Sequence, residues 1–274
     1  MSYLYLLGLS VAGSLLALCG GIFFLYNKKF FTVLEKHAIP FAAGTLITVA
    51  LLGIIPEALE MIGTTSLWIV LLSLLGAYIF ENFILATHHH DHNEHHHGHK
   101  HENKVSHGTA GLVVLGDTVH NFIDGVAIGA SFLVNPGLGI VTTISTFLHE
   151  VPHEIADFGI LLKAGWKKKD VLFINVVSAL FTVPGAFSVL LFANNEFLIA
   201  SLLSVAAGIF LYLGVIDFIP QVYASTKKSW SPLVSLTLGV LIMMATILIV
   251  PHSHPEGDHP EHDQQHAEEG VDHD

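Results

Sequence analysis

The chain has 274 residues, of which 52% are hydrophobic and 12% charged, and its mean hydropathy is +0.62. This composition excludes an ordinary soluble domain and is typical of a polytopic membrane protein. The formal net charge is −12, but eight of the 23 acidic residues follow Pro251. The charge is therefore a local property of the C-terminal tail, and no nucleic-acid partner is expected.

Apolar runs long enough to cross a lipid bilayer recur along the chain, so we expect an all-α fold with eight transmembrane helices. These helices are predicted at 3–26, 38–61, 65–87, 109–133, 138–162, 170–193, 197–220 and 232–250. The first run lacks the basic leader of a cleaved signal peptide and is treated as a retained span. It contains the single cysteine, Cys19, so no intramolecular disulfide can form.

All the basic residues are lysines, and each lies beside a connection from an odd-numbered to an even-numbered helix. They are Lys28, Lys29, Lys36, Lys100, Lys104, Lys163, Lys167, Lys168, Lys169, Lys227 and Lys228. Basic residues are retained on the cytoplasmic side of short loops. The pattern therefore predicts a protein of the plasma (inner) membrane with both termini outside the cytoplasm.

Two polar segments interrupt the apolar rhythm and divide the chain. Helices one to three occupy 1–87, a His-rich cytoplasmic loop follows at 88–107, helices four to eight occupy 108–250, and a tail rich in histidine and acids ends the chain at 251–274. The loop holds ten of the 20 histidines and the tail six. Both segments are expected to be disordered without metal, and their imidazoles are suited to gathering or sensing metal ions.

A faint internal repeat links helices two and seven. Ala-Ala-Gly at 42–44 stands twelve residues before Pro56, and Ala-Ala-Gly at 206–208 stands twelve residues before Pro220. The lysine pattern makes these two helices run in opposite directions. That is the arrangement of an inverted repeat of helices one to three and six to eight, with helices four and five at its centre.

Helix four carries ionisable residues where a membrane-spanning helix should have none, and such groups mark a function by default. Asp117, His120, Asn121 and Asp124 follow the spacing i, i+3, i+4 and i+7. They form one polar stripe on an apolar helix. We expect the stripe to face helix five.

Helix five presents its own ligand-type residues over about two turns. They are His149, Glu150, His153, Glu154 and Asp157. Pro152 removes a backbone donor among them and is expected to kink the helix and free a carbonyl. Irregular backbone at membrane depth is tolerated where it lines a polar cavity.

Neutral imidazole and carboxylate are the usual ligands of zinc and also serve ferrous iron and manganese. The two helices therefore predict a divalent transition-metal site. The alternative is that these side chains only hold helices together by hydrogen bonds, but each unpaired polar group would cost several kcal/mol in hydrocarbon. Gly125 and Gly129 form a small-residue pair that would let helix four pack closely on a neighbour.

A second interpretation comes from the stretch His149-Glu150-Val151-Pro152-His153. It matches the H-E-x-x-H pattern of zinc metalloproteases, in which glutamate is the general base. An intramembrane protease is therefore an alternative. Proline inside the motif is awkward for a regular ligand helix, and helix four offers a second His/Asp pair instead of a lone third ligand.

The two motifs together resemble the ZIP (Zrt-, Irt-like) divalent metal transporters, through His-Asn-x-x-Asp-Gly at 120–125 and His-Glu-x-Pro-His-Glu at 149–154. The resemblance implies an importer and not an enzyme. Zinc is the expected cargo, with iron, manganese or cadmium as others, moved toward the cytosol by alternating access. It also implies a homodimer in the lipid bilayer.

Carried over residue by residue, the resemblance places His120, Asp124, His149 and His153 in a primary site. Asn121 and Glu150 would join Asp124 and His153 around a second site, and Glu154 completes the motif. The chain departs from the family pattern in two places: helix two has only apolar residues and Gly53 near its Pro-Glu, and no acid lies between Val171 and Phe192.

Two further acids lie inside predicted spans. Asp217 stands three residues before Pro220, the position that Gly53 holds in the repeat, and either lines the pathway or pairs with a backbone amide. Glu81, deep in helix three, has no partner that the sequence identifies.

Overall fold

The computed structural model describes residues 3–26, 28–81, 107–226 and 230–251. Within these ranges every regular element is a helix, so the predicted all-α class is confirmed. The predicted His-rich loop and C-terminal tail lie outside the described residues, apart from His107 and Pro251 at their edges.

The described residues of the first half of the chain include six α-helices and the π-helix η1. They are α1 (Tyr3–Ser14), α2 (Leu18–Tyr26), α3 (Lys28–Thr48), the π-helix η1 (Val49–Ile54), α4 (Ile55–Ile62), α5 (Thr65–Ile79) and α6 (His107–Val134). The second half begins with α7 (Pro136–Lys163), α8 (Lys168–Ala179), α9 (Thr182–Ser188) and the 3-10 helix η4 (Val189–Phe192). It ends with α10 (Glu196–Leu211), the π-helix η5 (Tyr212–Phe218), α11 (Ile219–Thr226) and α12 (Ser231–Ile249).

Among the described residues, six helices are long and apolar enough to cross a membrane. They are Tyr3–Phe23, Lys36–Ile62, Ala110–Val134, Lys168–Phe192, Glu196–Phe218 and Ser231–Ile249. Each overlaps one of the predicted spans. The predicted third span contains the shorter apolar helix Thr65–Ile79, and the predicted fifth span falls within α7, whose polar residues lower its hydropathy.

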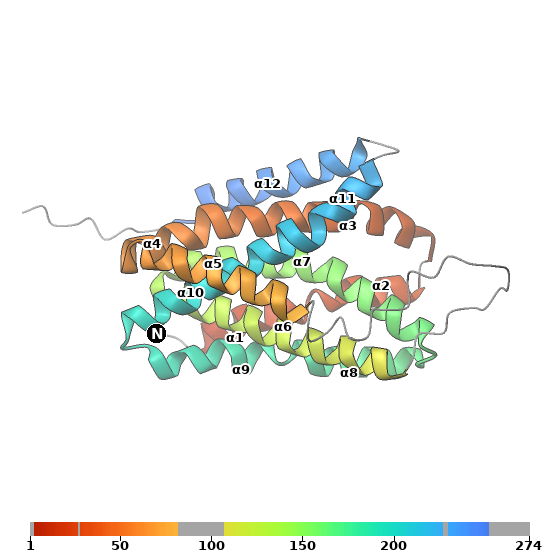
Figure 1. Ribbon diagram of the computed structural model, residues 1–274. Helices are drawn as coiled ribbons and strands as arrows, with labels where there is room; N and C mark the ends of the chain where they lie inside the picture. Colours follow the sequence, from red (N-terminus) through yellow and green to blue (C-terminus); the bar gives the residue numbers. More distant parts are fainter. Residues whose placement is uncertain (1–2, 27, 82–106, 227–229, 252–274) are drawn as a thin grey trace, which may run out of the picture.

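The helices run side by side along one common direction, with α6 and α7 packed against each other at the centre (Figure 1). A tight turn joins this central pair. Asn135 is extended, and its side chain accepts hydrogen bonds from the backbone N–H groups of Gly137 and Leu138. Pro136 then starts α7 at a position where its missing N–H costs nothing. The turn makes α6 and α7 antiparallel neighbours.

The other helices surround this central pair, and each of the two has its own neighbours. α9 packs on α6, whereas α1 and α2 pack on α7; farther out, α12 packs on α3 and α5 packs on α10. The side chains that face away from these contacts are apolar and exposed, for example Leu72, Leu191 and Leu248. Such a surface suits a bilayer and not water.

Glycines set how closely two of these helices approach. A Cβ on Gly125 would lie 2.0 Å from the carbonyl oxygen of Thr182, and one on Gly129 would lie 2.4 Å from that of Ala186. A Cβ on Gly185 of α9 would meet the carbonyl oxygen of Phe122 at 2.1 Å. The predicted close packing of the Gly125 and Gly129 pair is confirmed, and its partner is α9.

Candidate metal centre

α6 directs three of its four polar-stripe residues toward α7. Asp117 and Asp124 are buried, and the His120 side chain is 11% exposed. They meet α7 because the spacing of three and four residues keeps them on one face of an α-helix. The fourth residue, Asn121, is treated separately below because its amide points elsewhere.

α7 supplies the opposing ligands without a break in its helix. It runs from Pro136 to Lys163 through Pro152, and His149 and Glu150 are completely buried. Proline has no N–H, so the carbonyl of Leu148 lacks its usual helical donor. The helix thus stays continuous while one carbonyl beside the ligands is left without its i+4 partner.

Two short contacts cross between the helices. His120 Nε2 lies 2.9 Å from Glu150 Oε1, and His149 Nε2 lies 3.1 Å from Asp124 Oδ2. The same nitrogens lie 3.8 Å from the other carboxylate in each case. Two imidazole nitrogens and two carboxylate oxygens therefore converge on one small volume between α6 and α7.

The tautomer of His149 is set by its own helix. Its Nδ1 lies 2.9 Å from the carbonyl oxygen of Ser145, and a carbonyl can only accept, so Nδ1 carries the proton in this bond. Nε2 is then left with its lone pair facing Asp124. A hydrogen bond at the second ring nitrogen is the usual way in which proteins orient a metal-binding imidazole.

Beyond these contacts with one another, the converging atoms make no hydrogen bonds among the described residues. The orphaned atoms include His120 Nε2, His149 Nε2 and both oxygens of Asp124 and Glu150. One ligand atom from each of His120, Asp124, His149 and Glu150 lies within 4.8 Å of all the others. Buried polar groups are normally satisfied, and two imidazoles with two carboxylates are a donor set that zinc and related ions prefer. The group, which we call the histidine cluster, can hold a divalent transition-metal ion.

Asn121 is turned away from the histidine cluster. Its amide oxygen accepts hydrogen bonds from the hydroxyls of Ser14 on α1 and Thr182 on α9, and its amide nitrogen donates to Asp117 Oδ1 at 3.0 Å. The side chain is fully buried in this network. In this structure Asn121 ties α6 to α1 and α9 through its amide oxygen, and its amide nitrogen bonds to Asp117.

The remaining predicted residues of α7 lie beside the cluster. The ring of His153 stacks on that of His120, with 4.8 Å between the centroids and 16° between the planes. His153 is not among the four converging residues. Glu154, 1% exposed, lies with Asp117 and Glu150 in a second group of ligand atoms within 4.8 Å of one another, and Asp157 is also buried.

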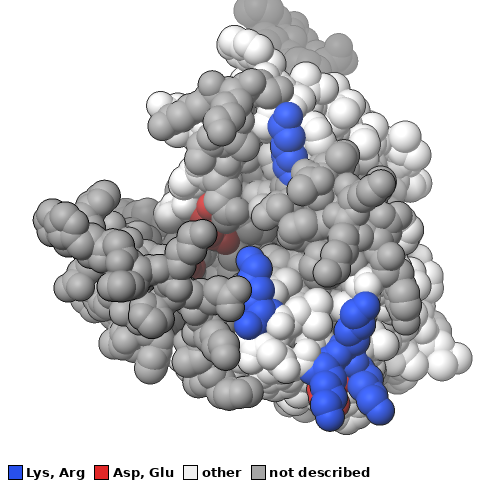
Figure 2. All heavy atoms as spheres, turned by 90° about the vertical axis from the view of Figure 1, so that its right-hand side faces the viewer, with Lys and Arg blue, Asp and Glu red and all other residues white. Residues whose placement is uncertain are grey.

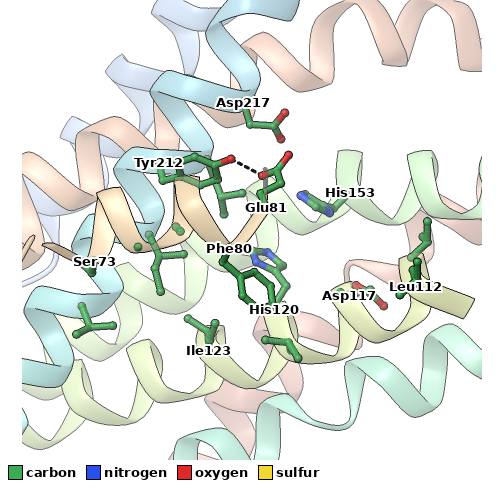
Figure 3. A pocket seen from close by; sticks show the side chains of 18 of the residues that line it. Ser73, Phe80, Glu81, Leu112, Asp117, His120, Ile123, His153, Tyr212 and Asp217 are labelled. Atoms are coloured by element: carbon green, nitrogen blue, oxygen red, sulfur yellow. Dashed lines mark hydrogen bonds between the residues drawn. The ribbon is translucent and has the colours of Figure 1, made fainter. Parts of the chain in front are cut away.

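A cavity of about 540 Å³ reaches the cluster from one side. It lies between α5, α6, α7, α10 and η5, and His120, His153, Asp117 and Asp157 line it (Figure 3). It follows α6 toward His107 and α7 toward Lys163. These ends belong to the face of the bundle on which Figure 2 shows lysine side chains, with acidic atoms in a recess between them.

Asp217 and Glu81, whose roles the sequence did not settle, both line the cavity. Asp217 lines the cavity, and Glu81 accepts a hydrogen bond from the hydroxyl of Tyr212 across it (Figure 3). Sequence reasoning missed Tyr212 because a tyrosine in an apolar helix has no distinguishing pattern. The available signal was Glu81 itself, because an acid within a predicted membrane span predicts a partner on a neighbouring helix.

Comparison with known proteins identifies the family. The family model described as ZIP Zinc transporter matches residues 2–247, which is most of the chain and includes both motif helices. The chain belongs to the ZIP zinc transporter family. Its all-helical fold and its membrane-spanning helices are those of an integral membrane protein of this family.

Individual members of the ZIP family match part of the chain. The zinc transporter foi of Drosophila melanogaster is 35% identical over 141 residues, which are 52% of this chain and 20% of that protein. Zinc transporter ZIP4 of Homo sapiens is 35% identical over 140 residues, or 51% of this chain and 22% of that protein. Zinc transporter ZIP10 of Danio rerio is 41% identical over 113 residues, or 41% of this chain and 13% of that protein. The matched parts thus span about a fifth or less of these relatives.

Proposed function

We propose that this protein transports divalent transition-metal ions, zinc first, across a membrane through the histidine cluster. The observation that carries the proposal is the convergence of four ligand residues, three of them buried. Apart from the contacts that they make with one another, their converging atoms have no hydrogen bond in the described structure. A hydrated cation entering the cluster exchanges water for imidazole nitrogen and carboxylate oxygen. Membership of the ZIP zinc transporter family supports the same conclusion.

The proposed ligands of the transported ion are His120, Asp124, His149 and Glu150. His153 lies against His120 and lines the cavity, which suits a ligand that the ion meets on entering or leaving the cluster. Iron, manganese and cadmium remain proposed alternative cargoes, because each accepts nitrogen and oxygen donors.

We propose that transport runs toward the cytosol. The positive-inside rule assigns the lysine-bearing end of the bundle to the cytoplasm. The cavity extends from the cluster toward this end, whereas the opposite side of the cluster is filled by buried apolar residues such as Ala127 and Val141. The arrangement suits a transporter in an inward-facing state, with both termini on the outer side of the plasma membrane.

We propose that α5 and α7 cross the membrane together with the six longer helices, which gives eight spans. A two-part internal symmetry supports this count. The π-helices η1 and η5 lie directly before the Ile-Pro pairs at 55–56 and 219–220, in matching register with the Ala-Ala-Gly repeat. A Cβ on Gly44 would lie 2.3 Å from the Leu236 carbonyl of α12, and one on Gly208 would lie 2.4 Å from the Val70 carbonyl of α5.

The two repeat helices also run in opposite directions, α3 entering the bundle from the end at which α10 and η5 leave it (Figure 1). These features support an inverted repeat of helices one to three and six to eight around α6 and α7. On the family resemblance we further propose a homodimer, which crosslinking of the membrane-embedded protein tests directly.

The protease interpretation is not supported. In a zinc metalloprotease of the H-E-x-x-H type, the two histidines bind one ion together. Here His149 converges with His120, Asp124 and Glu150, while His153 stacks outside that group. The matched relatives are described as zinc transporters.

Zinc uptake into proteoliposomes tests the proposal. The wild-type protein should fill vesicles that contain a zinc-sensitive dye, and His120→Ala and His149→Ala should reduce uptake to background because each removes a ligand nitrogen. His37→Ala is the matched control, since His37 bonds to Ser235 and lies away from the cluster. Iron, manganese and cadmium as competitors rank the cargoes. Transport is excluded if folded wild type takes up no metal, and cleavage of a transmembrane peptide would favour the protease.

A further inference from the structure

A group of three carboxylates lies next to the histidine cluster and contains no histidine. One oxygen from each of Asp117, Glu150 and Glu154 lies within 4.8 Å of the others. Asp117 is 6% exposed, Glu150 0% and Glu154 1%. Three buried carboxylates at this separation repel one another strongly unless a cation or protons lie between them.

Few donors hold these carboxylates in place: Asn121 donates to one oxygen of Asp117, and His120 Nε2 lies 2.9 Å from one oxygen of Glu150. Asp117 Oδ2 and both oxygens of Glu150 and of Glu154 are buried without a hydrogen bond among the described residues. Asp117 uses only its other oxygen, which accepts from Asn121. Since Glu150 Oε1 faces His120, four oxygens are left without a short contact: Asp117 Oδ2, Glu150 Oε2 and both oxygens of Glu154. They point to a missing ligand, because buried carboxylates are normally paired or bound to metal.

We propose that Asp117, Glu150 and Glu154 form a second divalent-cation site, made of oxygen ligands only. The site belongs to the same pathway as the histidine cluster, so its role in release rests on the proposed function. It differs in composition from the second site that the family resemblance implies, which would include Asn121. The Asn121 amide oxygen is already occupied by the hydroxyls of Ser14 and Thr182.

The second site lies on the cavity side of the histidine cluster. Asp117 precedes His120 on α6, and Glu154 follows Glu150 by one turn on α7. Asp117 and Glu154 are therefore both nearer than the histidine cluster to the lysine-bearing end of the bundle, where α6 begins and α7 ends. Asp117 also lines the cavity. An ion leaving the cluster for the cavity would thus pass the three carboxylates.

Glu150 connects the two sites, since it belongs to both groups of ligand atoms. An ion can move from one group to the other while it keeps a bond to this carboxylate, and full rehydration at depth is avoided. Carboxylate sites favour harder ions such as manganese, whereas imidazole favours zinc. Zinc is therefore held less tightly at the second site, which favours its onward release.

Anomalous X-ray diffraction from crystals of the full chain soaked with manganese or zinc locates each ion directly. Wild type should show two peaks, one in the histidine cluster and one between Asp117, Glu150 and Glu154. The double variant Asp117→Asn/Glu154→Gln should lose only the second peak, because its side chains keep their shape but lose their charge. Asp157→Asn is the matched control and should keep both peaks, since Asp157 is buried nearby but outside the group.

The wild-type map alone decides whether the site exists, so the test does not depend on how well the variant folds. A single peak in the histidine cluster at saturating manganese overturns the proposal, and so does a double variant that keeps both peaks or loses both. Two peaks in a wild type that carries no zinc into vesicles would leave the second site standing and overturn the transport function instead.

Discussion

The two halves of the bundle on either side of the histidine cluster are filled in different ways. On the lysine-bearing side the cluster borders a cavity of about 540 Å³ with acids in its wall. On the other side Leu46, Ala50, Ala127 and Val141 are fully buried in one apolar core. The helices α6, α7 and α10 contribute both to that core and to the wall of the cavity.

The contrast shows which part of the molecule must rearrange if it works by alternating access. Within the described residues the cavity borders the cluster from the open half, so passage of an ion from the far side would require the filled half to separate.

Filling the open half should have the largest effect. Gly116 lines the cavity, and a Cβ at this position would meet nothing within 4 Å. Gly116→Leu should therefore fit, fill the cavity and reduce zinc uptake into proteoliposomes to near background. Helix stability should not suffer, because glycine in a helix interior costs about 0.5–1 kcal/mol relative to alanine.

Gly111→Leu is the matched control for this substitution. Gly111 lies on the same helix, also has open space around it, and does not line the cavity. Uptake should stay at the wild-type level. Equal inhibition by both variants would mean that the cavity is not the route of the ion.

Cysteine labelling should show directly that the open half is accessible to water and the filled half is not. In a Cys19→Ser background, Val113→Cys places a thiol in the cavity wall, whereas Val141→Cys places one in the filled half at 0% exposure. A water-soluble thiol reagent should modify the first at least about tenfold faster, because reaction at a buried thiol needs an opening that costs free energy. Mass spectrometry of the intact protein measures both rates. Equal rates would show that the filled half opens freely.

Tight packing of α6 beyond the cluster should be measurable as lost stability. Gly125→Ala places a Cβ 2.0 Å from the carbonyl oxygen of Thr182, so α9 must move. Overpacking of this kind costs about 1–3 kcal/mol. Gly76→Ala is the control, since its Cβ would meet nothing within 4 Å. Thermal unfolding in detergent should show a lower midpoint for the first variant only, and an unchanged midpoint for Gly125→Ala would refute the close contact.

Much of this architecture could be predicted because membrane-spanning helices can be recognised in a sequence from the length and hydropathy of their apolar runs. The apolar runs located the helices, and the spacing of His120 with Asp124 placed both on the face that meets α7. The small-residue pair Gly125 and Gly129 was predicted to permit close packing, which is confirmed.

Other features depend on contacts that a one-dimensional pattern does not contain. Asn121 shares the polar stripe with His120, but its direction is set by Ser14 and Thr182 on two other helices. The positions of the π-helices η1 and η5 could not be predicted either, because no residue type marks this rare, wider helical turn. Helix periodicity thus predicts which residues share a face, whereas the hydroxyls of Ser14 and Thr182 on neighbouring helices hold the Asn121 amide oxygen.

The smallest effect is expected at the edge of the cavity, where the Tyr212 hydroxyl bonds to Glu81. Tyr212→Phe removes this bond between η5 and the end of α5 and should cost about 1 kcal/mol or less, because Glu81 is exposed and water replaces the lost donor. Glu81→Gln keeps an acceptor for the hydroxyl but removes the charge. If the carboxylate attracts cations to the cavity, Glu81→Gln should raise the zinc concentration for half-maximal uptake while Tyr212→Phe leaves it unchanged. The opposite ranking would assign the pair a purely structural role in holding the open half in shape.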